Sequence, residues 1–507
     1  MKFENSYLDL GKAFYQQTLP VPVAAPQLLL WNTGLGDSFG LGQGSPDDEQ
    51  KALIFSGNRI MEDSTPIALA YSGHQFGHFN PQLGDGRAHL LGELLDGQQR
   101  RFDVQLKGSG PTRFSRQGDG RCALKPALRE FIMSEALHAL KVPTSRCLAV
   151  VSSGETVYRE TPQPGAIVTR IAQSHLRVGS FQHFASRGDL KSLHQLLDYA
   201  IARHYPNIAG DTSAKALQFL QQVAQRQIEL ICHWMRIGFI HGVMNTDNTA
   251  ISGETIDYGP CAMMGDYHPG TVYSSIDSQG RYAYGNQMNI AIWNMARLAE
   301  SLLPLLADDQ QQAINLAETS IGQLVDDFSV AYRQMLVSKL GIEQANADTG
   351  PLIESLLSIM QEKELDYTQT FHSLTKFIER GELSEGLTQA LHPWLGKWLT
   401  ALGVAEVTED NNMFARIGDA RGEQLKRAVT TMKAMNPVLI PRNHHVETTL
   451  DMYQDAMLTG ENWQQAETRL QQFLIALRSP YQQTEYTGQF QDAAADKDKG
   501  YRTFCGT

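Results

Sequence analysis

Two kinds of hydrophobic pattern divide this chain, and their order limits the folds that it can adopt. From about residue 50 to 170, short alternating runs such as FDVQLK (102–107) and AVVSSGETVYRE (149–160) are separated by turn signals such as LGDGR and LDGQQ. Alternation with a period of two is typical of strands joined by turns. From about residue 189, long stretches such as ALQFLQQVAQRQIELICHWMRIG (216–238) carry apolar residues at helical spacing. We therefore expect an antiparallel, sheet-rich half followed by a helical half.

One helix is expected inside the sheet-rich half. Pro126 suits a first helical turn, ALREFIMSEALHAL (127–140) has helical periodicity, and Pro143 marks its end. This order of parts predicts an α+β, bilobal protein-kinase-like fold. We place a sheet-rich N-lobe at residues 1–180 and a large helical C-lobe, with a helical C-terminal extension, at residues 181–480. Residues 481–507 lack an apolar pattern and are predicted to form a flexible tail.

Composition excludes several classes of protein. The chain has 507 residues, 42% of them hydrophobic, and a formal net charge of -12. This charge argues against general binding to nucleic acids or anionic membranes, which recruit basic proteins. The five cysteines form no C-x-x-C pair, and no stretch has the length of a membrane helix or the apolar core of a signal peptide. We expect a cytoplasmic protein that acts as a monomer.

The stretch HGVMNTDNTAISGETIDYGP (241–260) carries the main chemical signal. A protein-kinase catalytic loop, H-R-D-L-x-x-x-N, has its base two residues after the His and a metal-binding Asn seven residues after it. His241 and Asn248 keep the spacing of seven, but Val243 occupies the position of the base. We assign the nearby Asp247 as the general base or as the group that orients the attacking hydroxyl.

Asp257 follows Asn248 in a D-Y-G triplet, where kinases hold a metal ion with D-F-G. We expect the intervening segment to form a tight hairpin turning at Gly253, which would bring the Asn248 amide oxygen and the Asp257 carboxylate together. Such oxygen ligands, completed by nucleotide phosphates, suit Mg²⁺ or Mn²⁺. The alternative is that these side chains only form turn hydrogen bonds.

A basic stretch could bind the phosphates. Residues 99–146 contain ten Lys or Arg against four Asp or Glu. Lys107 ends the strand FDVQLK, and Glu130 in the following helix is predicted to form the ion pair that sets a kinase lysine against nucleotide phosphates. Glu135 is the competitor, but five residues further along a helix it faces elsewhere. The alternative for the whole stretch is a solvated basic face.

Two further segments could contact phosphates. In NPQLGDGRAHLLGE (80–93), Gly84 and Gly86 would let backbone amides approach a phosphate and Arg87 would add charge; a plain hairpin is the alternative. In TRIAQSHLRVGSF (169–181), Arg170 and Arg177 are seven residues apart, which on a helix is the same face. Surface ion pairs with carboxylates are the alternative there.

The stretch YSGHQFGHF (71–79) spaces His74 and His78 four residues apart. It lacks the Glu of H-E-x-x-H and is rich in glycine, so structural packing is favoured over a zinc site.

Taken together, YSGHQFG, LGDGRA, LKGSGPTRFSRQGDGR, HGVMNTDN and DYGP resemble motifs of the selenoprotein O family of protein adenylyltransferases, over about residues 30–480. The resemblance implies a pseudokinase fold in which ATP lies reversed relative to kinases, so that AMP passes to a Ser, Thr or Tyr hydroxyl of a protein and pyrophosphate leaves. UTP with Mn²⁺ is a donor and metal also associated with bacterial members.

The resemblance also implies roles for individual residues. Asp247 would be the proton acceptor, and Asn248 and Asp257 would bind the metal ion. The residues that would contact the nucleotide are Gly84, Gly86, Arg87, Lys107, Asp119, Gly120, Arg170 and Arg177. Glu130 and Asp257 complete the predicted nucleotide site.

The family carries a selenocysteine or cysteine close to the C-terminus, which Cys505 matches. In some members this residue pairs with a cysteine after the DYG motif. The corresponding segment here (267–282) contains none, and Cys261 directly follows DYGP, so a redox latch is not expected in this chain.

An inactive pseudokinase that binds nucleotide as a scaffold is the alternative to an enzyme. Retention of Lys107, Asn248 and Asp257 argues against it, because a scaffold has no need of metal ligands.

Overall fold

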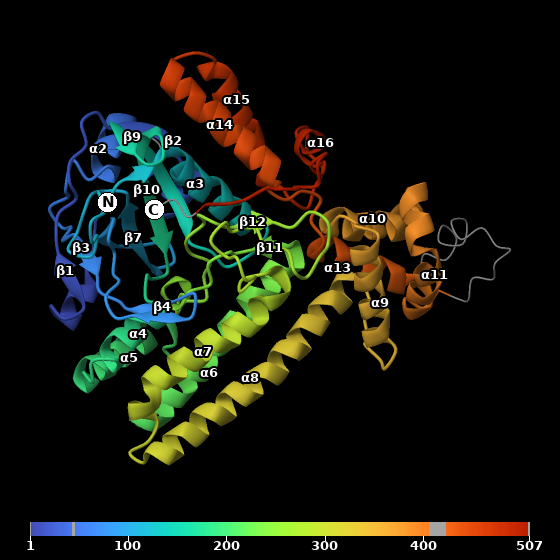
Figure 1. Ribbon diagram of the computed structural model, residues 1–507, viewed down its shortest axis with the longest axis horizontal. Coiled ribbons are helices and arrows are strands. Elements are labelled where there is room, and N and C mark those ends of the chain that lie inside the picture. The colour runs from blue at the N-terminus through green and yellow to red at the C-terminus, as the bar shows by residue number, and fades with distance from the viewer. Residues whose placement is uncertain (1, 43–45, 405–421, 505–507) are drawn as a thin grey trace.

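An antiparallel sheet forms the N-terminal part of the molecule. The computed structural model describes residues 2–42, 46–404 and 422–504 (Figure 1). The strand order is β1-β3-β6-β7-β10-β9-β2, with β8 pairing to β10, and each of these pairings is antiparallel. The predicted sheet-rich region is confirmed. Its strands are β1 (Tyr15–Gln17), β2 (Gln27–Trp31), β3 (Ile67–Leu69), β6 (Ala88–Leu95), β7 (Arg101–Lys107), β8 (Cys122–Ala123), β9 (Arg146–Tyr158) and β10 (Pro162–Ala172).

Both faces of this sheet are buried, which explains why its central strands are apolar without strict alternation. Val150 and Val168, paired between β9 and β10, belong to the main core together with α3 (Leu124–Ala139). The next pair, Val151 and Ile167, belongs to a second core, which includes residues of α1 (Thr33–Ser38) and α2 (Asp48–Phe55). Successive strand residues point to opposite faces, so the sheet holds α3 in a fixed position on one side.

The chain is mainly helical after the sheet, as predicted. The side chain of Asp211 accepts a hydrogen bond from Ala214 N at the start of α6, and Gly238, with φ +75°, ends that helix. No helix in the described ranges is long and apolar enough to cross a membrane. The helices are α4 (Val178–Ala185), α5 (Leu190–His204), α6 (Thr212–Ile237), α7 (Gln287–Leu306), α8 (Gln310–Lys339), α9 (Thr349–Glu362), α10 (Tyr367–Arg380), α11 (Glu385–Ala401), α13 (Glu423–Met435), α14 (Asn443–Thr459), α15 (Trp463–Leu477) and α16 (Thr487–Phe490).

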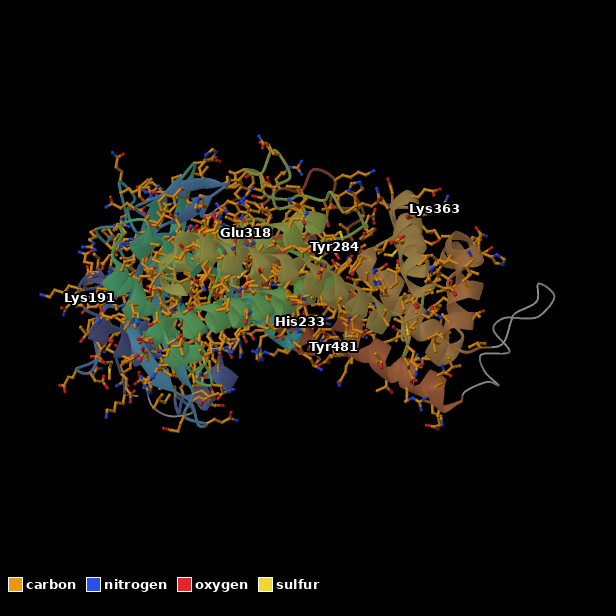
Figure 2. All side chains as sticks on the ribbon, turned by 90° about the horizontal axis from the view of Figure 1, so that it is seen from below. Lys191, His233, Tyr284, Glu318, Lys363 and Tyr481 are labelled. Atoms are coloured by element: carbon orange, nitrogen blue, oxygen red, sulfur yellow. The ribbon has the colours of Figure 1, made fainter. Side chains whose placement is uncertain are left out.

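The helical part extends the molecule away from the sheet. Helices α6, α7 and α8 lie side by side, and α14 packs on α3 (Figure 1). In Figure 2, Lys191 at the start of α5 and Lys363 just after α9 lie toward opposite ends of the molecule. The shorter elements are two small ladders, β4 (Gly73–Gln75) with β5 (His78–Asn80) and β11 (Phe239–Ile240) with β12 (Ala262–Met263), and the 3₁₀ turns η1 (Ser6–Leu10), η2 (Thr246–Asn248) and η3 (Tyr284–Asn286).

The C-terminal segment 482–504 packs against the body of the protein. The Phe490 side chain is fully buried, the backbone of Thr503 exchanges hydrogen bonds with Tyr273 and Ser275, and its hydroxyl donates to Pro260 O at 2.7 Å. The expectation of a flexible tail therefore does not describe these residues. The prediction relied on a continuous apolar pattern, whereas the segment is held by a few separate contacts, such as those of Phe490 and Thr503. Cys505 lies outside the described residues.

Candidate active site

The predicted site residues converge on one cleft. A cavity of about 400 Å³ opens between loops of the sheet and the segment 241–260. A hollow of about 500 Å³ between α14 and α15 is lined mainly by glutamines. Its lining includes no carboxylate or histidine that could act as a general base or bind a metal ion. Of the predicted residues, Glu130 lies behind the wall of the first cleft. Those that line it are Gly84, Gly86, Arg87, Lys107, Asp119, Gly120, Arg170, Arg177, Asp247, Asn248 and Asp257.

A group of four charges, which we call the charge quartet, forms part of one wall, with Glu130 behind it and Asp257 half-buried. It consists of Lys107 from β7, Glu130 from α3, Arg170 from β10, and Asp257. Lys107 Nζ lies 2.7 Å from Glu130 Oε2 and 3.0 Å from Asp257 Oδ1. Arg170 Nε bonds Glu130, and Arg170 Nη2 lies 3.6 Å from Asp257 Oδ1. The predicted Lys107–Glu130 pair is thus present, whereas Glu135 pairs with Arg146.

The two cations of the charge quartet keep both of its carboxylates ionised. Burial alone would raise the pKa of Glu130, but Arg170 and Lys107 outweigh burial and lower it. Burial likewise opposes ionisation of Asp257, yet Lys107 and Arg170 hold its pKa well below the usual range. Asp257 also has φ +67°, a left-handed conformation that costs about 1 kcal/mol for a residue other than glycine. The quartet is therefore a preformed, strained and charged surface.

Asp247 lines the same cleft in a different environment. It is 8% exposed, and burial raises its pKa to about 6 against the opposing charge of Arg177. Its Oδ2 accepts a hydrogen bond from Gln75 Nε2 at 3.1 Å. Its Oδ1 is buried and has no hydrogen-bond partner among the described residues. Asp247 can therefore accept a proton from a group that enters the cleft.

Asn248 and His241 differ in function. The Asn248 amide nitrogen donates to Val243 O at 3.1 Å, which leaves its oxygen as the free acceptor of the side chain. His241 is buried, stacks on Trp234 with ring centroids 5.1 Å apart, and bonds Ile256 O through Nε2 at 2.8 Å. His241 thus joins the start of the loop to the residue before Asp257 and does not line the cleft.

The hairpin predicted between Asn248 and Asp257 does not form as a ladder. Gly253 does turn the chain, with φ +75° and its N–H donating to Ala250 O at 3.1 Å. However, Ala250 pairs with Arg177, and Thr255 pairs with Thr144. The two arms bind other segments because the turn is inserted between the loop before α4 and the loop after α3. Both predicted metal ligands nevertheless line the same cleft.

Arg170 and Arg177 do not share a helix, so the helical spacing of seven is not what brings them together. Arg170 lies in β10, and Arg177 is the residue before α4. Arg177 stacks on Tyr71, 4.3 Å from the ring centroid, and donates to Asp247 O at 3.0 Å. The two arginines line one cleft because the end of β10 and the start of α4 meet there, and not because of helical spacing.

The predicted glycines allow close packing of the loops at the mouth of the cleft. A Cβ on Gly84, where φ is +117°, would lie 2.4 Å from Phe114 Cγ, and one on Gly120, where φ is +69°, would lie 2.2 Å from Gly110 C. Asp119 is held by Arg159 at 2.8 Å, a hydrogen bond that lowers its pKa. Loop packing alone accounts for these glycines, and it also leaves their backbone exposed to the cleft.

Gln75 is a site residue that the sequence pattern did not reveal. It lies in the β4–β5 hairpin, for which structural packing was expected, and it lines the cleft beside Asp247. The only signal was its place in the YSGHQFG motif. Within the described residues, no group of three or more His, Cys, Asp or Glu is arranged to hold a metal ion.

Comparisons with known proteins agree with this site. The family described as "Protein adenylyltransferase SelO" matches residues 1–474. Proteins named "Protein nucleotidyltransferase YdiU" are similar over the whole chain: that of Teredinibacter turnerae is 47% identical over 509 residues, and that of Pseudoalteromonas translucida 49% over 507 residues, with 100% of both chains covered in each case. The protein of this name from Bacillus cereus strain G9842 is 46% identical over 509 residues, covering 99% of this chain and 98% of the relative. The chain therefore belongs to the SelO family of protein adenylyltransferases.

Proposed function

We propose that the cleft binds ATP and transfers AMP to a hydroxyl group of a protein, with Asp247 as the proton acceptor. Membership of the adenylyltransferase family supports the reaction class. The observation that carries the residue assignment is the Asp247 carboxylate, which is buried, held at one oxygen by Gln75 and, among the described residues, without a hydrogen-bond partner at the other. A carboxylate of raised pKa at this place suits a general base.

The nucleotide is proposed to lie reversed relative to a protein kinase. Lys107, Arg170 and Arg177 supply positive charge for the phosphates, and the α-phosphate is directed toward Asp247. This orientation accounts for Val243, because a base placed for transfer of the γ-phosphate would have no function. Gly84, Gly86, Arg87, Asp119 and Gly120 line the remainder of the cleft and would contact the nucleotide.

The reaction exchanges one bond to phosphorus for another. The hydroxyl oxygen of the acceptor attacks the α-phosphorus, and a phosphodiester bond forms. The bond between the α-phosphorus and the oxygen that bridges to the β-phosphorus breaks, and pyrophosphate leaves with that oxygen. The proton of the hydroxyl passes to the Asp247 carboxylate.

Asn248 and Asp257 are proposed to hold Mg²⁺ or Mn²⁺. The donor set fits, because Mg²⁺ is usually held by one or two protein oxygens together with substrate phosphates and water. Asn248 offers an amide oxygen and Asp257 an ionised carboxylate on the same cleft. When bound, the cation would neutralise charge on the phosphates. Removing divalent cations with EDTA should therefore abolish transfer, and adding Mg²⁺ or Mn²⁺ should restore it.

Finer features are proposals of the same kind. The donor is ATP, with UTP as the alternative, and the acceptors are Ser, Thr or Tyr. The fold is proposed to be kinase-like and bilobal, with an N-lobe at 1–180, a C-lobe at 181–480 and a C-terminal segment from 481. The order of a sheet with α1, α2 and α3 between its strands, followed by a run of helices, supports this division.

The test compares ATP labelled at the α-phosphate with ATP labelled at the γ-phosphate, using the chain itself and casein as acceptors. We expect protein to acquire only the α-label, and Asp247→Asn to abolish labelling while ATP still raises the melting temperature. Transfer of the γ-label alone would show kinase chemistry. If neither the wild type nor the variant labels protein, while ATP still raises the melting temperature, the inactive scaffold would be favoured.

A further inference from the structure

The β4–β5 hairpin docks on the segment that carries Asp247 through consecutive residues. Each of three neighbours in the hairpin donates one hydrogen bond to one of three neighbours in the loop. The pairs are His74 N to Thr246 Oγ1 at 2.7 Å, Gln75 Nε2 to Asp247 Oδ2 at 3.1 Å, and Phe76 N to Asn245 Oδ1 at 3.1 Å. The hairpin therefore holds all three loop residues, and its middle residue, Gln75, bonds Asp247.

Further bonds fix both partners in place. Thr246 Oγ1 donates to Gln182 Oε1 at 2.6 Å, and the Gln182 amide nitrogen lies 2.8 Å from His74 Nδ1. Tyr282 OH donates to Asn245 Oδ1 at 2.6 Å. Because the backbone on both sides of Gln75 is anchored, its side chain starts from a defined position. The Gln75–Asp247 bond is thus part of a built network and not an isolated surface contact.

The Asp247 carboxylate accepts a hydrogen bond from the Gln75 side chain, besides one from its own backbone. Arg177 reaches Asp247 only through the backbone carbonyl, at 3.0 Å from Nη1. Among the described residues, the side-chain hydrogen bond to Asp247 comes from Gln75, and Oδ1 receives none. A carboxylate held at one oxygen cannot rotate freely, so its second oxygen keeps a constant direction.

We infer that Gln75 is a positioning residue: by holding Asp247 Oδ2, it orients the carboxylate that is proposed to take the proton of the acceptor hydroxyl. This inference rests on the proposed function of Asp247. The role needs a side chain with an N–H donor at the distance of Nε2. Methionine has a similar length but no donor, and the Nε2–H of a histidine lies at a similar distance along the side chain.

The experiment compares Gln75→Met and Gln75→His with the wild type, using α-labelled ATP, casein as acceptor and saturating Mn²⁺. Because misplacement of a reacting group by about 1 Å can reduce the rate about 100-fold, we expect Gln75→Met to lower kcat about 10- to 100-fold. The KM for ATP and the ATP-driven rise in melting temperature should stay unchanged, since Gln75 acts on the acceptor side. Gln75→His should recover most of the rate.

His78→Gln is the matched control, because His78 pairs with Gln75 in the hairpin ladder and is exposed. We expect wild-type kcat from it. A wild-type kcat in Gln75→Met would overturn the inference, as would equal losses in the Met and His variants together with a raised KM for ATP, which indicate packing alone. If Gln75→Met does not fold, Gln75→Leu replaces it with the same criteria. Failure of the proposed function has a different signature, namely no labelling by the wild type or full labelling by Asp247→Asn.

Discussion

At the scale of single residues, a buried carboxyl outside the cleft makes stability depend on pH. Glu254 is 6% exposed, and its Oε2 accepts hydrogen bonds from Ser252 Oγ at 2.7 Å and Gln173 N at 3.0 Å. Burial raises its pKa from 4.5 to about 7, with Asp103 raising it further and Arg226 lowering it. The folded protein therefore binds this proton more tightly than the unfolded chain does.

The sign of the effect follows from this difference in proton binding. Stabilisation by the protonated Glu254 is complete below pH 4.5 and is lost as the pH rises through about 7. Since one pKa unit corresponds to about 1.4 kcal/mol, ionising Glu254 inside the fold costs about 3 kcal/mol. We expect urea unfolding at pH 5, 6.5 and 8 to show that the free energy of unfolding of Glu254→Gln, relative to that of the wild type, rises by about this amount as the pH increases.

Glu318→Gln is the control, because Glu318 is exposed on α8 (Figure 2). Its stability should follow that of the wild type at every pH. Parallel pH dependences for wild type and Glu254→Gln would contradict the assignment.

At the scale of single residues, the sequence predicted which side chains meet, while their roles stay predictions. Lys107, Glu130 and Asp257 could be matched because their spacing follows a known chemical pattern, and all three meet in the charge quartet. Gln75 could not be identified, because its bond to Asp247 joins residues 172 positions apart and a glutamine carries no signal of its own.

At the scale of elements, the start of α4 packs directly against the residue that precedes the hairpin. A Cβ on Gly179 would lie 2.1 Å from Ser72 O, and Ser72 N donates to Gly179 O at 3.1 Å. Ser72 immediately precedes β4, so it cannot move without the hairpin. The absence of a side chain at Gly179 thus sets the distance between α4 and β4.

We predict that Gly179→Ala destabilises the protein although alanine is the better helix former. Alanine in a helix gains about 1 kcal/mol over glycine, but forced overpacking costs about 1–3 kcal/mol and here meets backbone. The melting temperature and the transfer rate should both fall. Gly322→Ala is the control, since Gly322 lies within α8 with no atom within 4 Å of its Cβ, and this variant should become more stable. A more stable Gly179→Ala would refute the argument.

The errors of prediction at this scale share one cause. For the segment 169–181 a shared helical face was considered for Arg170 and Arg177, and the segment 249–256 was expected to form one hairpin. In the structure, Ile251 N donates to Leu176 O at 2.9 Å and Val178 N to Thr249 O at 3.0 Å, so the two segments bind each other. Pairing between segments about 70 residues apart leaves no local period in the sequence.

At the scale of the whole molecule, the C-terminal segment joins the helical part to α3. Tyr501 OH donates to Glu447 Oε1 at 2.7 Å and accepts from Arg129 Nη2 at 3.3 Å. Arg129 is buried next to Glu130 on α3, and it also donates to Cys261 O at 2.5 Å. The segment therefore braces the helix that supplies a member of the charge quartet.

We predict that Tyr501→Ala lowers stability by about 2 kcal/mol, because it removes a partly buried ring and one partner of a buried cation. Thermal unfolding and the transfer rate should both show the loss. Phe504→Ala is the control, since Phe504 is 70% exposed and should have little effect. Equal behaviour of the two variants would argue that the segment is not a brace.

The order of sheet and helices was predictable, because long periodic patterns depend on burial alone. The packing of residues 482–504 was not, because it depends on anchors such as Phe490 and Tyr501 at irregular spacing, whose partners are distant in the chain.

The charge quartet described above has a thermodynamic consequence for ligand uptake. Its formal charges cancel, with Asp257 held by the same cations that are proposed to meet the phosphates. A divalent cation that binds alone would be repelled by Lys107 and Arg170, and a polyphosphate that binds alone would be repelled by Asp257. Each ligand removes the repulsion that the other would suffer, so their affinities should rise together by the same factor. Titration of either one in the presence and absence of the other would measure this synergy as a heterotropic linkage.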